Sequence, residues 1–201
     1  EGLRTDFSVK LFEYITMLGE ETILILLVAV LYFAFDKKLA MRIGYITITF
    51  MCVNNTLKNL VKRPRPFVAG DVNPARAHTA TGYSFPSGHT QTIATWATTF
   101  AMYFKKKWVS LLAGIAIIAV AFSRLFLGVH YPSDVIVGAV LGIAMAVGLS
   151  IICDKTEDLH RLYGITCLVM LLFAVFFLVT ADPLYDDFFN LYGMITGLYI
   201  A

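Results

Sequence analysis

The sequence predicts an all-α integral membrane protein, a six-helix transmembrane bundle with an N-terminal amphipathic helix and the start of a further C-terminal span. Of the 201 residues, 58% are hydrophobic and 15% are charged. A soluble domain has roughly 45–50% apolar and about 25% charged residues. The apolar residues are also gathered into long stretches with short polar stretches between them. Residues 1–201 are therefore interpreted as one bilayer-embedded domain.

Residues 1–18 have the pattern of an amphipathic helix. Their large apolar side chains share one helical face, and the charged residues lie elsewhere. The apolar face is made of Leu3, Phe7, Leu11, Tyr14 and Leu18. Such a helix either lies at the membrane interface or packs against the bundle, and the sequence leaves both arrangements open.

Six apolar stretches follow, and we expect each to cross the membrane. Several are shorter than the ~20 residues of a straight span, so flanking residues must complete the crossing. The expected spans are residues 22–36, 40–57, 88–104, 108–128, 134–152 and 161–180, with the start of a seventh at 188–201. The region from about residue 160 is a C-terminal extension of the part that carries the motifs described below, residues 58–134.

Charge and cysteine content exclude two classes of protein. The net charge is only +2 and the longest basic run is residues 105–107, which argues against a nucleic-acid partner. Cys52, Cys153 and Cys167 are too widely spaced for a disulfide framework or a metal-ligand set, and we interpret them as small apolar residues. They leave the redox compartment open. Because the chain starts at Glu1 rather than Met, the lack of a signal peptide carries no information about targeting.

The loops between the expected spans open alternately on two sides of the membrane. Side A holds loops 36–42, 105–107 and 153–161, and side B holds residues 1–18 and loops 58–87, 124–133 and 181–187. Each side carries eight Lys and Arg residues. If Lys58, Arg65 and Arg124 on side B bind a ligand, the counts become eight and five, which places side A in the cytoplasm. Two loops of side B, 58–87 and 124–133, are separated by an even number of crossings, so their side chains can converge on one face.

The stretch Pro86-Ser87-Gly88-His89 stands where the third span begins. Ser87 is suited to the N-cap position, which leaves the amides of Gly88 and His89 as first-turn donors. A helix N-terminus of this kind favours an anion, and phosphate above all. The alternative is a capped helix that carries an interfacial histidine.

Basic residues gather at the same face. Lys58 and Arg65 belong to "KNLVKRPRP", residues 58–66, and a solvated or headgroup-binding cluster is the alternative to a ligand site there. Arg124 follows Lys107 by about 24 Å of helix, less than a ~30 Å bilayer core, so it lies at membrane depth. An arginine at that depth needs an anion or a wet cavity, unless it snorkels to the interface.

His130 and Asp134 are four residues apart where a helix can begin at Pro132. A carboxylate on one ring nitrogen fixes the tautomer and leaves the other nitrogen free as a nucleophile or base. His89, across the site, would then protonate a leaving oxygen. Two histidines, one carboxylate and three cations suit phosphoryl transfer without a metal, because charge neutralisation and positioning supply most of the rate. Each histidine alone is equally compatible with a hydrogen-bonded interfacial imidazole.

These residues resemble the three motifs of the type 2 phosphatidic acid phosphatase superfamily, membrane lipid phosphatases that share an active-site design with vanadium haloperoxidases. Lys-x6-Arg-Pro corresponds to Lys58, Arg65 and Pro66, and Pro-Ser-Gly-His corresponds to residues 86–89. Ser-Arg-x5-His-x3-Asp corresponds to Ser123, Arg124, His130 and Asp134. Order, spacing and membrane context agree, and the trio is far more specific than any one motif.

The resemblance implies a role for each residue. His130 would attack phosphorus and carry a phosphohistidine, oriented by Asp134, while His89 would act as the general acid. The phosphoryl oxygens would be bound by Lys58, Arg65, Ser87, Gly88 and Arg124. No metal or other cofactor is implied, and the partners are the bilayer and a lipid substrate.

The expected activity is dephosphorylation of a membrane lipid phosphate or pyrophosphate. The candidate substrates are undecaprenyl pyrophosphate, phosphatidylglycerol phosphate, phosphatidate and sphingoid-base phosphates, and the sequence does not rank them. The alternatives are a lipid phosphotransferase and a non-catalytic lipid-binding or transport protein. We expect the cell membrane as location, with the site on the non-cytoplasmic face; the oligomeric state is left open.

Other polar residues are expected outside the chemistry. The loop 67–85 is the longest, and by its position we expect it to act as a partial lid that helps to choose the head group. His78 and His160 match no motif and are expected to be solvated. Three asparagines are expected to bond between helices, namely Asn54, Asn55 and Asn59. The acidic loop 182–187 either repels anionic lipids or has no role.

Overall fold

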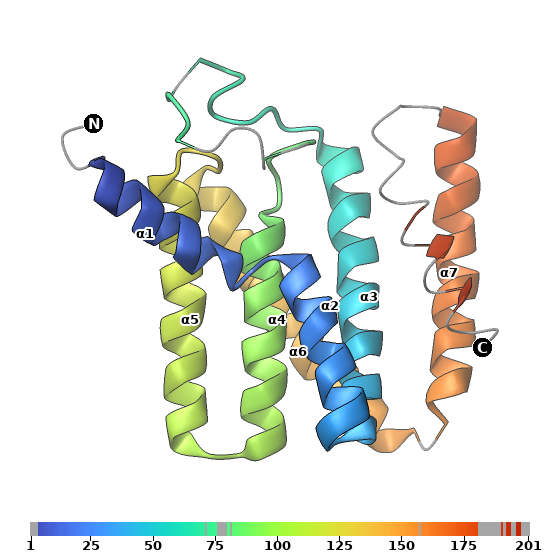
Figure 1. The fold of residues 1–201 in the computed structure, drawn as a ribbon. Helices are drawn as coiled ribbons and strands as arrows, with labels where there is room; N and C mark the ends of the chain where they lie inside the picture. The colour runs from blue at the N-terminus through green and yellow to red at the C-terminus, as the bar shows by residue number, and fades with distance from the viewer. Residues whose placement is uncertain are drawn as a thin grey trace.

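The chain folds into a bundle of helices with loops at both ends (Figure 1). The structure, a computed structural model, describes residues 4–70, 72–75, 80, 82–156 and 158–180, together with 190, 192, 193, 196 and 197. The helices are α1 (Asp6–Met17), α2 (Glu21–Val30), the π-helix η1 (Leu31–Phe35), α3 (Lys37–Val61), α4 (Gly88–Phe104), α5 (Lys107–Phe126), α6 (Pro132–Lys155) and α7 (Leu159–Thr180). The expected loop at 182–187 and most of the expected segment 188–201 lie outside the described residues.

Local sequence sets where several of these helices begin and end. Thr5 and Ser8 form a capping box at the start of α1, and the Asp36 carboxylate accepts from the Leu39 amide at the start of α3. The helices α3 and α4 both end on a lysine in the left-handed region, Lys62 and Lys105, each with φ of 51°.

α4 and α6 pack closely because α6 presents small residues to α4. Gly138, Gly142 and Ala146 recur every fourth residue and are buried. A Cβ built on Gly142 would lie 2.5 Å from the Gln91 carbonyl oxygen, and one on Gly138 would lie 2.7 Å from the Ser87 carbonyl oxygen. Small residues at this spacing let membrane helices approach backbone to backbone. The beginning of α4 is thereby held against α6.

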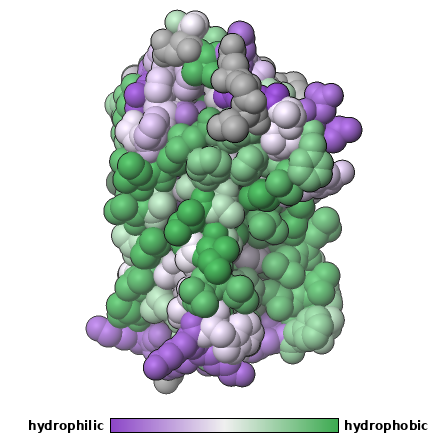
Figure 2. Space-filling view, turned by 90° about the vertical axis from the view of Figure 1, so that its left-hand side faces the viewer, coloured by the Kyte–Doolittle hydropathy of each residue, from purple (hydrophilic) through white to green (hydrophobic). Residues whose placement is uncertain are grey.

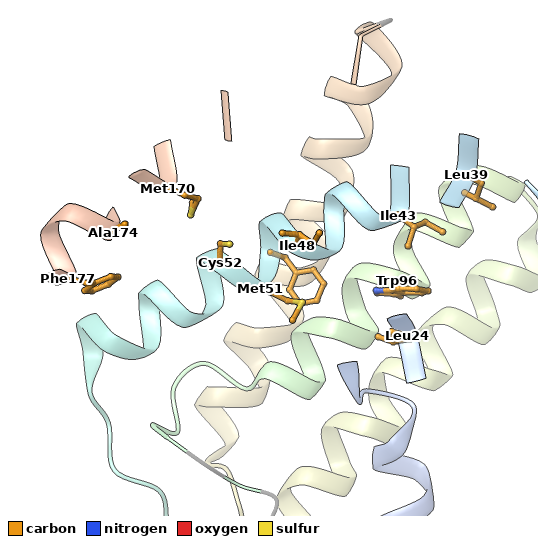
Figure 3. Close-up of a cluster of buried hydrophobic side chains, with 11 residues drawn as sticks. Leu24, Leu39, Ile43, Ile48, Met51, Cys52, Trp96, Met170, Ala174 and Phe177 are labelled. Atoms are coloured by element: carbon orange, nitrogen blue, oxygen red, sulfur yellow. The ribbon is translucent and has the colours of Figure 1, made fainter. Parts of the chain in front are cut away.

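A hydrophobic cluster joins α2, α3, α4 and α7 (Figure 3). Its buried members are Leu24, Leu39, Ile43, Ile48, Phe50, Met51, Cys52, Trp96, Met170, Ala174 and Phe177. A buried hydrogen bond of 2.9 Å between the hydroxyls of Tyr45 and Thr166 ties α7 to α3 as well. The C-terminal extension is therefore packed against the part of the chain that carries the motifs.

On the face that Figure 2 shows, apolar residues form a belt across the middle of the molecule and hydrophilic residues gather at its two ends. Within the described part of the chain, three helices are long and apolar enough to cross a membrane, namely Lys107–Phe126, Pro132–Lys155 and His160–Thr180. α1 with the following helical segment adds a fourth if that bent pair is one span. The expected number of six spans is not confirmed. The difference lies in the other expected spans, because α4 has only 17 residues and both α3 and α4 bury many polar side chains.

α1 combines the two arrangements that the sequence left open. Its expected apolar face is exposed, with Phe7 and Tyr14 78% and 72% accessible. The opposite face packs on α5, where the Phe12 ring lies 4.2 Å from the Phe126 ring. Leu3 is not among the described residues. α1 is thus docked on the bundle while an apolar stripe faces outward.

Candidate active site

The loops that carry the motifs meet at one end of the bundle (Figure 1). The Ser84 amide donates to the Arg63 carbonyl at 2.9 Å, and the Ser87 amide donates to the Asp134 carbonyl at 3.1 Å. The expectation that loops 58–87 and 124–133 share a face is confirmed.

Asp134 lies in the first turn of α6, and its carboxylate is completely buried. Oδ2 accepts from the Tyr131 amide at 2.9 Å and from the Ser84 hydroxyl, and it lies 3.5 Å from His130 Nδ1. Oδ1 accepts from Arg63 Nη1 at 2.9 Å. Both oxygens are engaged, so the carboxylate has one fixed orientation toward the imidazole.

His130 is held from both sides of its ring. Arg65 Nη1 lies 3.3 Å from Nε2, and the same guanidinium donates to the carbonyls of Val129 at 3.1 Å and Gly82 at 3.0 Å. Because a guanidinium has only donors, Nε2 is the accepting nitrogen and the ring proton is on Nδ1, toward Asp134. The unprotonated nitrogen therefore faces a cation that also suits a phosphoryl oxygen.

Burial controls the charge of these loop residues. The pKa of His130 is lowered to about 3, chiefly by burial; the bond to Asp134 opposes the shift, and the nearby Arg65, Arg124 and Lys58 add to it. Burial also lowers the pKa of Arg65 to about 10. At neutral pH the imidazole is uncharged and the guanidinium is charged, as a nucleophile and an anion-binding group require.

The PSGH stretch forms the start of α4, with Ser87 at the N-cap position. The Ser87 hydroxyl does not cap a backbone amide; it bonds the Thr90 hydroxyl at 3.0 Å. The expectation that Ser87 stands at the N-cap position of this helix is confirmed. Lys58, in the last turn of α3, lies alongside, with Nζ 3.8 Å from a Cβ built on Gly88. His89 lies within electrostatic range of Lys58, Arg65, Arg124 and His130.

Arg124 is buried in the last turn of α5, with 2% of its surface exposed. Its Nη1 donates to the hydroxyl of Thr16 in α1 at 3.0 Å. The preceding Ser123 turns inward and donates to the Val120 carbonyl at 2.7 Å. Arg124 is therefore not a snorkelling arginine, since its head group points into the bundle rather than out to solvent.

Two residues at the site were not predicted from the sequence, Arg63 and Ser84. Arg63 was grouped with the basic cluster 58–66, yet its guanidinium lies 4.0 Å from the Tyr131 ring centroid and bonds Asp134 and Ser133. Ser84 donates to Asp134 and lies 3.4 Å from His130 Nδ1. Arg63 stands at a variable position inside the first motif and Ser84 stands two residues before the second, and neither place predicts a bond to Asp134.

The asparagines and histidines that were expected to lie outside the chemistry differ in their surroundings. Asn54 donates to Gln91 in α4 at 2.6 Å, which confirms an interhelical role, while Asn59 bonds the Asn55 carbonyl in its own helix. His160 is exposed, and His78 lies outside the described residues. Among the residues described, no group of three or more His, Cys, Asp or Glu is arranged to hold a metal ion.

The long loop is anchored beside the site at three described positions. The Ala75 amide donates to the Leu127 carbonyl at 3.1 Å, and Arg4 donates to the Asn73 carbonyl at 2.6 Å. Ala80 is buried against Leu127 and Val129. The expected function of the loop as a lid stays a prediction.

Comparison with known proteins places this geometry in a family. The chain is 34% identical over 105 residues to lipid A 4'-phosphatase of Bacteroides thetaiotaomicron, a match that covers 48% of this chain and 46% of the relative. It is 31% identical over 135 residues to undecaprenyl-diphosphatase of Sulfolobus acidocaldarius, covering 66% of this chain and 64% of the relative. Either match spans less than two thirds of the relative's length.

Among solved structures, the crystal structure of a transmembrane PAP2 type phosphatidylglycerolphosphate phosphatase from Bacillus subtilis superimposes with a TM-score of 0.67. It is 26% identical, and the match covers 78% of this chain and 81% of that chain. The sequence description of the PAP2 superfamily matches residues 39–158, which is more than half of the chain and includes all three motifs. The resemblance drawn from the motifs is therefore confirmed, and the chain belongs to the PAP2 superfamily.

Proposed function

We propose that the protein is a metal-independent phosphatase of membrane lipid phosphates or diphosphates that works through a phosphohistidine intermediate. The observation that carries the proposal is the imidazole of His130, with Asp134 beside Nδ1 and the Arg65 guanidinium beside Nε2. Names of phosphatases among the relatives agree with it.

In the first step, His130 Nε2 forms a bond to phosphorus and the bond from phosphorus to the leaving oxygen breaks. Lys58, Arg65 and Arg124 neutralise the phosphoryl oxygens, helped by Ser87 and the amide of Gly88. His89, at the start of α4, gives a proton to the leaving oxygen. In the second step water attacks phosphorus, the bond to Nε2 breaks, and His89 takes the proton of the water.

In both steps the Asp134 carboxylate accepts a hydrogen bond from the N–H group at Nδ1 of His130. It thereby keeps Nε2 unprotonated before attack and stabilises the positive charge that the ring gains on phosphorylation. The hydrogen bonds from Arg63, Ser84 and the Tyr131 amide hold the carboxylate ready for this task.

The substrate is proposed to be an amphiphile with a phosphomonoester or diphosphate head group that enters from the bilayer. The loops that carry the site lie at one end of the bundle (Figure 1), so a head group would reach the site while the tails stay in lipid. If Lys58, Arg65 and Arg124 bind the substrate and are left out of the count, side A carries more Lys and Arg residues than side B. This supports a site on the non-cytoplasmic face of the cell membrane.

A lipid phosphotransferase is the second candidate, because transfer of the phosphoryl group from His130 to an alcohol needs the same residues. A binding or transport protein is less well supported, since binding alone does not require a histidine with a fixed tautomer beside a second histidine.

The test is phosphate release by detergent-purified protein in excess EDTA, beside the variant His130→Ala. The substrates are undecaprenyl pyrophosphate, phosphatidylglycerol phosphate, phosphatidate, a sphingoid-base phosphate and lipid A. We expect turnover of at least one lipid, loss of turnover in the variant, and competitive inhibition by vanadate, which resembles the trigonal-bipyramidal transition state. Release that requires added metal, or that survives in His130→Ala, would contradict the proposal.

A further inference from the structure

α1 and the turn that follows it lie outside residues 39–158, the part that matches the PAP2 superfamily, yet together they contact two residues of the motifs, Arg124 and His89. We propose that Thr16 in α1 is a positioning residue for Arg124, and that the turn after α1 forms part of the wall of the active site. This inference rests on the proposed function, because it assigns Arg124 to the phosphoryl oxygens.

The contact between Thr16 and Arg124 is completely buried. Thr16 is 0% exposed and Arg124 is 2% exposed, and the distance from Nη1 to the Thr16 hydroxyl oxygen is 3.0 Å. Inside a membrane protein, a hydrogen bond to a guanidinium replaces the water that the charge would otherwise need. The Thr16 hydroxyl therefore fixes one edge of the guanidinium.

The second contact is between Gly19 and His89. A Cβ built on Gly19 would lie 2.7 Å from the carbonyl oxygen of His89 and 3.0 Å from its Cβ. No ordinary side chain fits between the turn and the start of α4 at this distance, so Gly19 allows the turn to lie directly against His89.

Ring packing keeps α1 in the same place. Phe12 contacts both Phe122 and Phe126 on α5, with ring centroids 5.5 Å and 4.2 Å apart. These two phenylalanines flank Arg124 in sequence, so the last turns of α5 and the inner face of α1 pack as one unit. Thr16 follows Phe12 by one helical turn, which places its hydroxyl at the guanidinium.

The consequence is a preorganised cation. Arginine has a long flexible side chain, and a catalytic group that is misplaced by about 1 Å costs up to about 10²-fold in rate. Holding one edge of the guanidinium before substrate arrives directs its other donors to the phosphoryl oxygens. Loss of the hydroxyl should therefore weaken binding of a phosphoryl mimic as well as turnover.

The experiment compares Thr16→Val, which has nearly the same shape without the hydroxyl, with Thr16→Ser, which keeps the hydroxyl. The matched control is Thr49→Val, a buried threonine whose hydroxyl bonds only the Tyr45 carbonyl of its own helix among the contacts described. Each full-length variant is purified in detergent and checked for an unchanged thermal midpoint. The readouts are kcat and KM for the best lipid of the panel, and the dissociation constant of vanadate by titration calorimetry.

We expect Thr16→Val to lower kcat/KM and to weaken vanadate binding, each by about tenfold. Thr16→Ser should recover most of both, and Thr49→Val should match the wild type. Wild-type values in Thr16→Val, or equal losses in the Ser and Val variants, would overturn the inference.

The calorimetric readout separates this inference from the proposed function. If the wild type releases no phosphate but binds vanadate and Thr16→Val binds it more weakly, the proposed function fails and the inference stands. If the wild type turns over lipid while Thr16→Val is unaffected, only the inference fails. A wild type that binds no vanadate overturns it too, because Arg124 is then not part of an oxyanion site.

Discussion

Asp134 has the densest set of hydrogen bonds among the proposed catalytic residues. Its Oδ1 accepts from Arg63 and its Oδ2 from Ser84 and the Tyr131 amide, beside His130 Nδ1. An asparagine offers one oxygen for all of these donors and turns an NH2 group toward one of them. We expect Asp134→Asn to lower kcat by about 10²-fold or more with little change in KM, because orientation of the nucleophile is lost and substrate contacts are not.

Ser84→Ala serves as the graded comparison. It removes one of several donors to the same carboxylate, so a loss of about tenfold in kcat is expected. Steady-state kinetics on the best lipid measures both variants. A wild-type kcat in Asp134→Asn, or a larger loss of kcat in Ser84→Ala than in Asp134→Asn, would contradict the proposed role of the carboxylate in orienting His130.

The charge state of His130 predicts how stability depends on pH. Its pKa is about 3 in the folded protein because burial disfavours the imidazolium, against ~6.5 for an exposed imidazole. Between those values the unfolded chain holds more protons, so the free energy of unfolding rises with pH, by at most about 1.4 kcal/mol per pH unit. Above that window the contribution is constant.

Comparison with His130→Gln isolates this group from the others that titrate. The thermal midpoint of the wild type should fall more steeply than that of the variant as the pH is lowered from about 6.5 to about 4.5. Parallel falls in the two proteins would show that His130 is not buried as an uncharged ring.

That the proposed catalytic residues come together could be predicted, because they stand at fixed spacings in the sequence. His130 and Asp134 are four residues apart, and Pro132 begins α6 between them. Arg63 and Ser84 could not be predicted, since their bonds to Asp134 join residues 71 and 50 positions apart. Such contacts depend on how the loops fold back, for which no short-range pattern exists.

At the scale of the elements, the contact of α4 with α6 controls where His89 lies. A Cβ on Gly142 would meet the Gln91 carbonyl oxygen at 2.5 Å and the Ala94 Cβ at 2.7 Å, both on α4. Gly142→Ala should therefore push the helices apart and destabilise the fold by roughly 1–3 kcal/mol. Gly148→Ala on the same helix is the control, because nothing lies within 4 Å of its built Cβ.

Thermal unfolding in detergent measures the two variants side by side. A lower midpoint in Gly142→Ala alone is expected, since alanine is otherwise the better helix former. If both variants melt with the wild type, the close approach of the two helices is not as the structure describes.

The positions of several helices could be predicted from hydropathy alone, without knowledge of the tertiary structure. The expected span 88–104 coincides with α4. The expected spans 108–128 and 134–152 begin within two residues of the first residues of α5 and α6. The number of membrane crossings did not follow, because polar side chains inside the bundle lower the hydropathy of helices that lipid does not fully surround. The exposed face of α1 was predicted, whereas the contact of Thr16 with Arg124 was not, because Thr16 is separated from Arg124 by 108 positions.

For the molecule as a whole, orientation in the membrane decides which lipids the site can meet. Side A carries eight Lys and Arg residues, whereas side B carries five once Lys58, Arg65 and Arg124 are assigned to the ligand. Basic loops stay in the cytoplasm, so the site should open on the other side.

Cysteine labelling in intact cells tests the orientation directly. In a background with the three native cysteines replaced by serine, Val68→Cys places a thiol in the exposed part of the long loop, and Lys106→Cys places one in the exposed turn between α4 and α5. A membrane-impermeant maleimide should label Val68→Cys from outside, and Lys106→Cys only after the membrane is permeabilised. The reverse pattern would place the site in the cytoplasm and would restrict its substrates to lipids of the inner leaflet. Retained phosphate release by each single-cysteine variant shows that the labelled protein is folded.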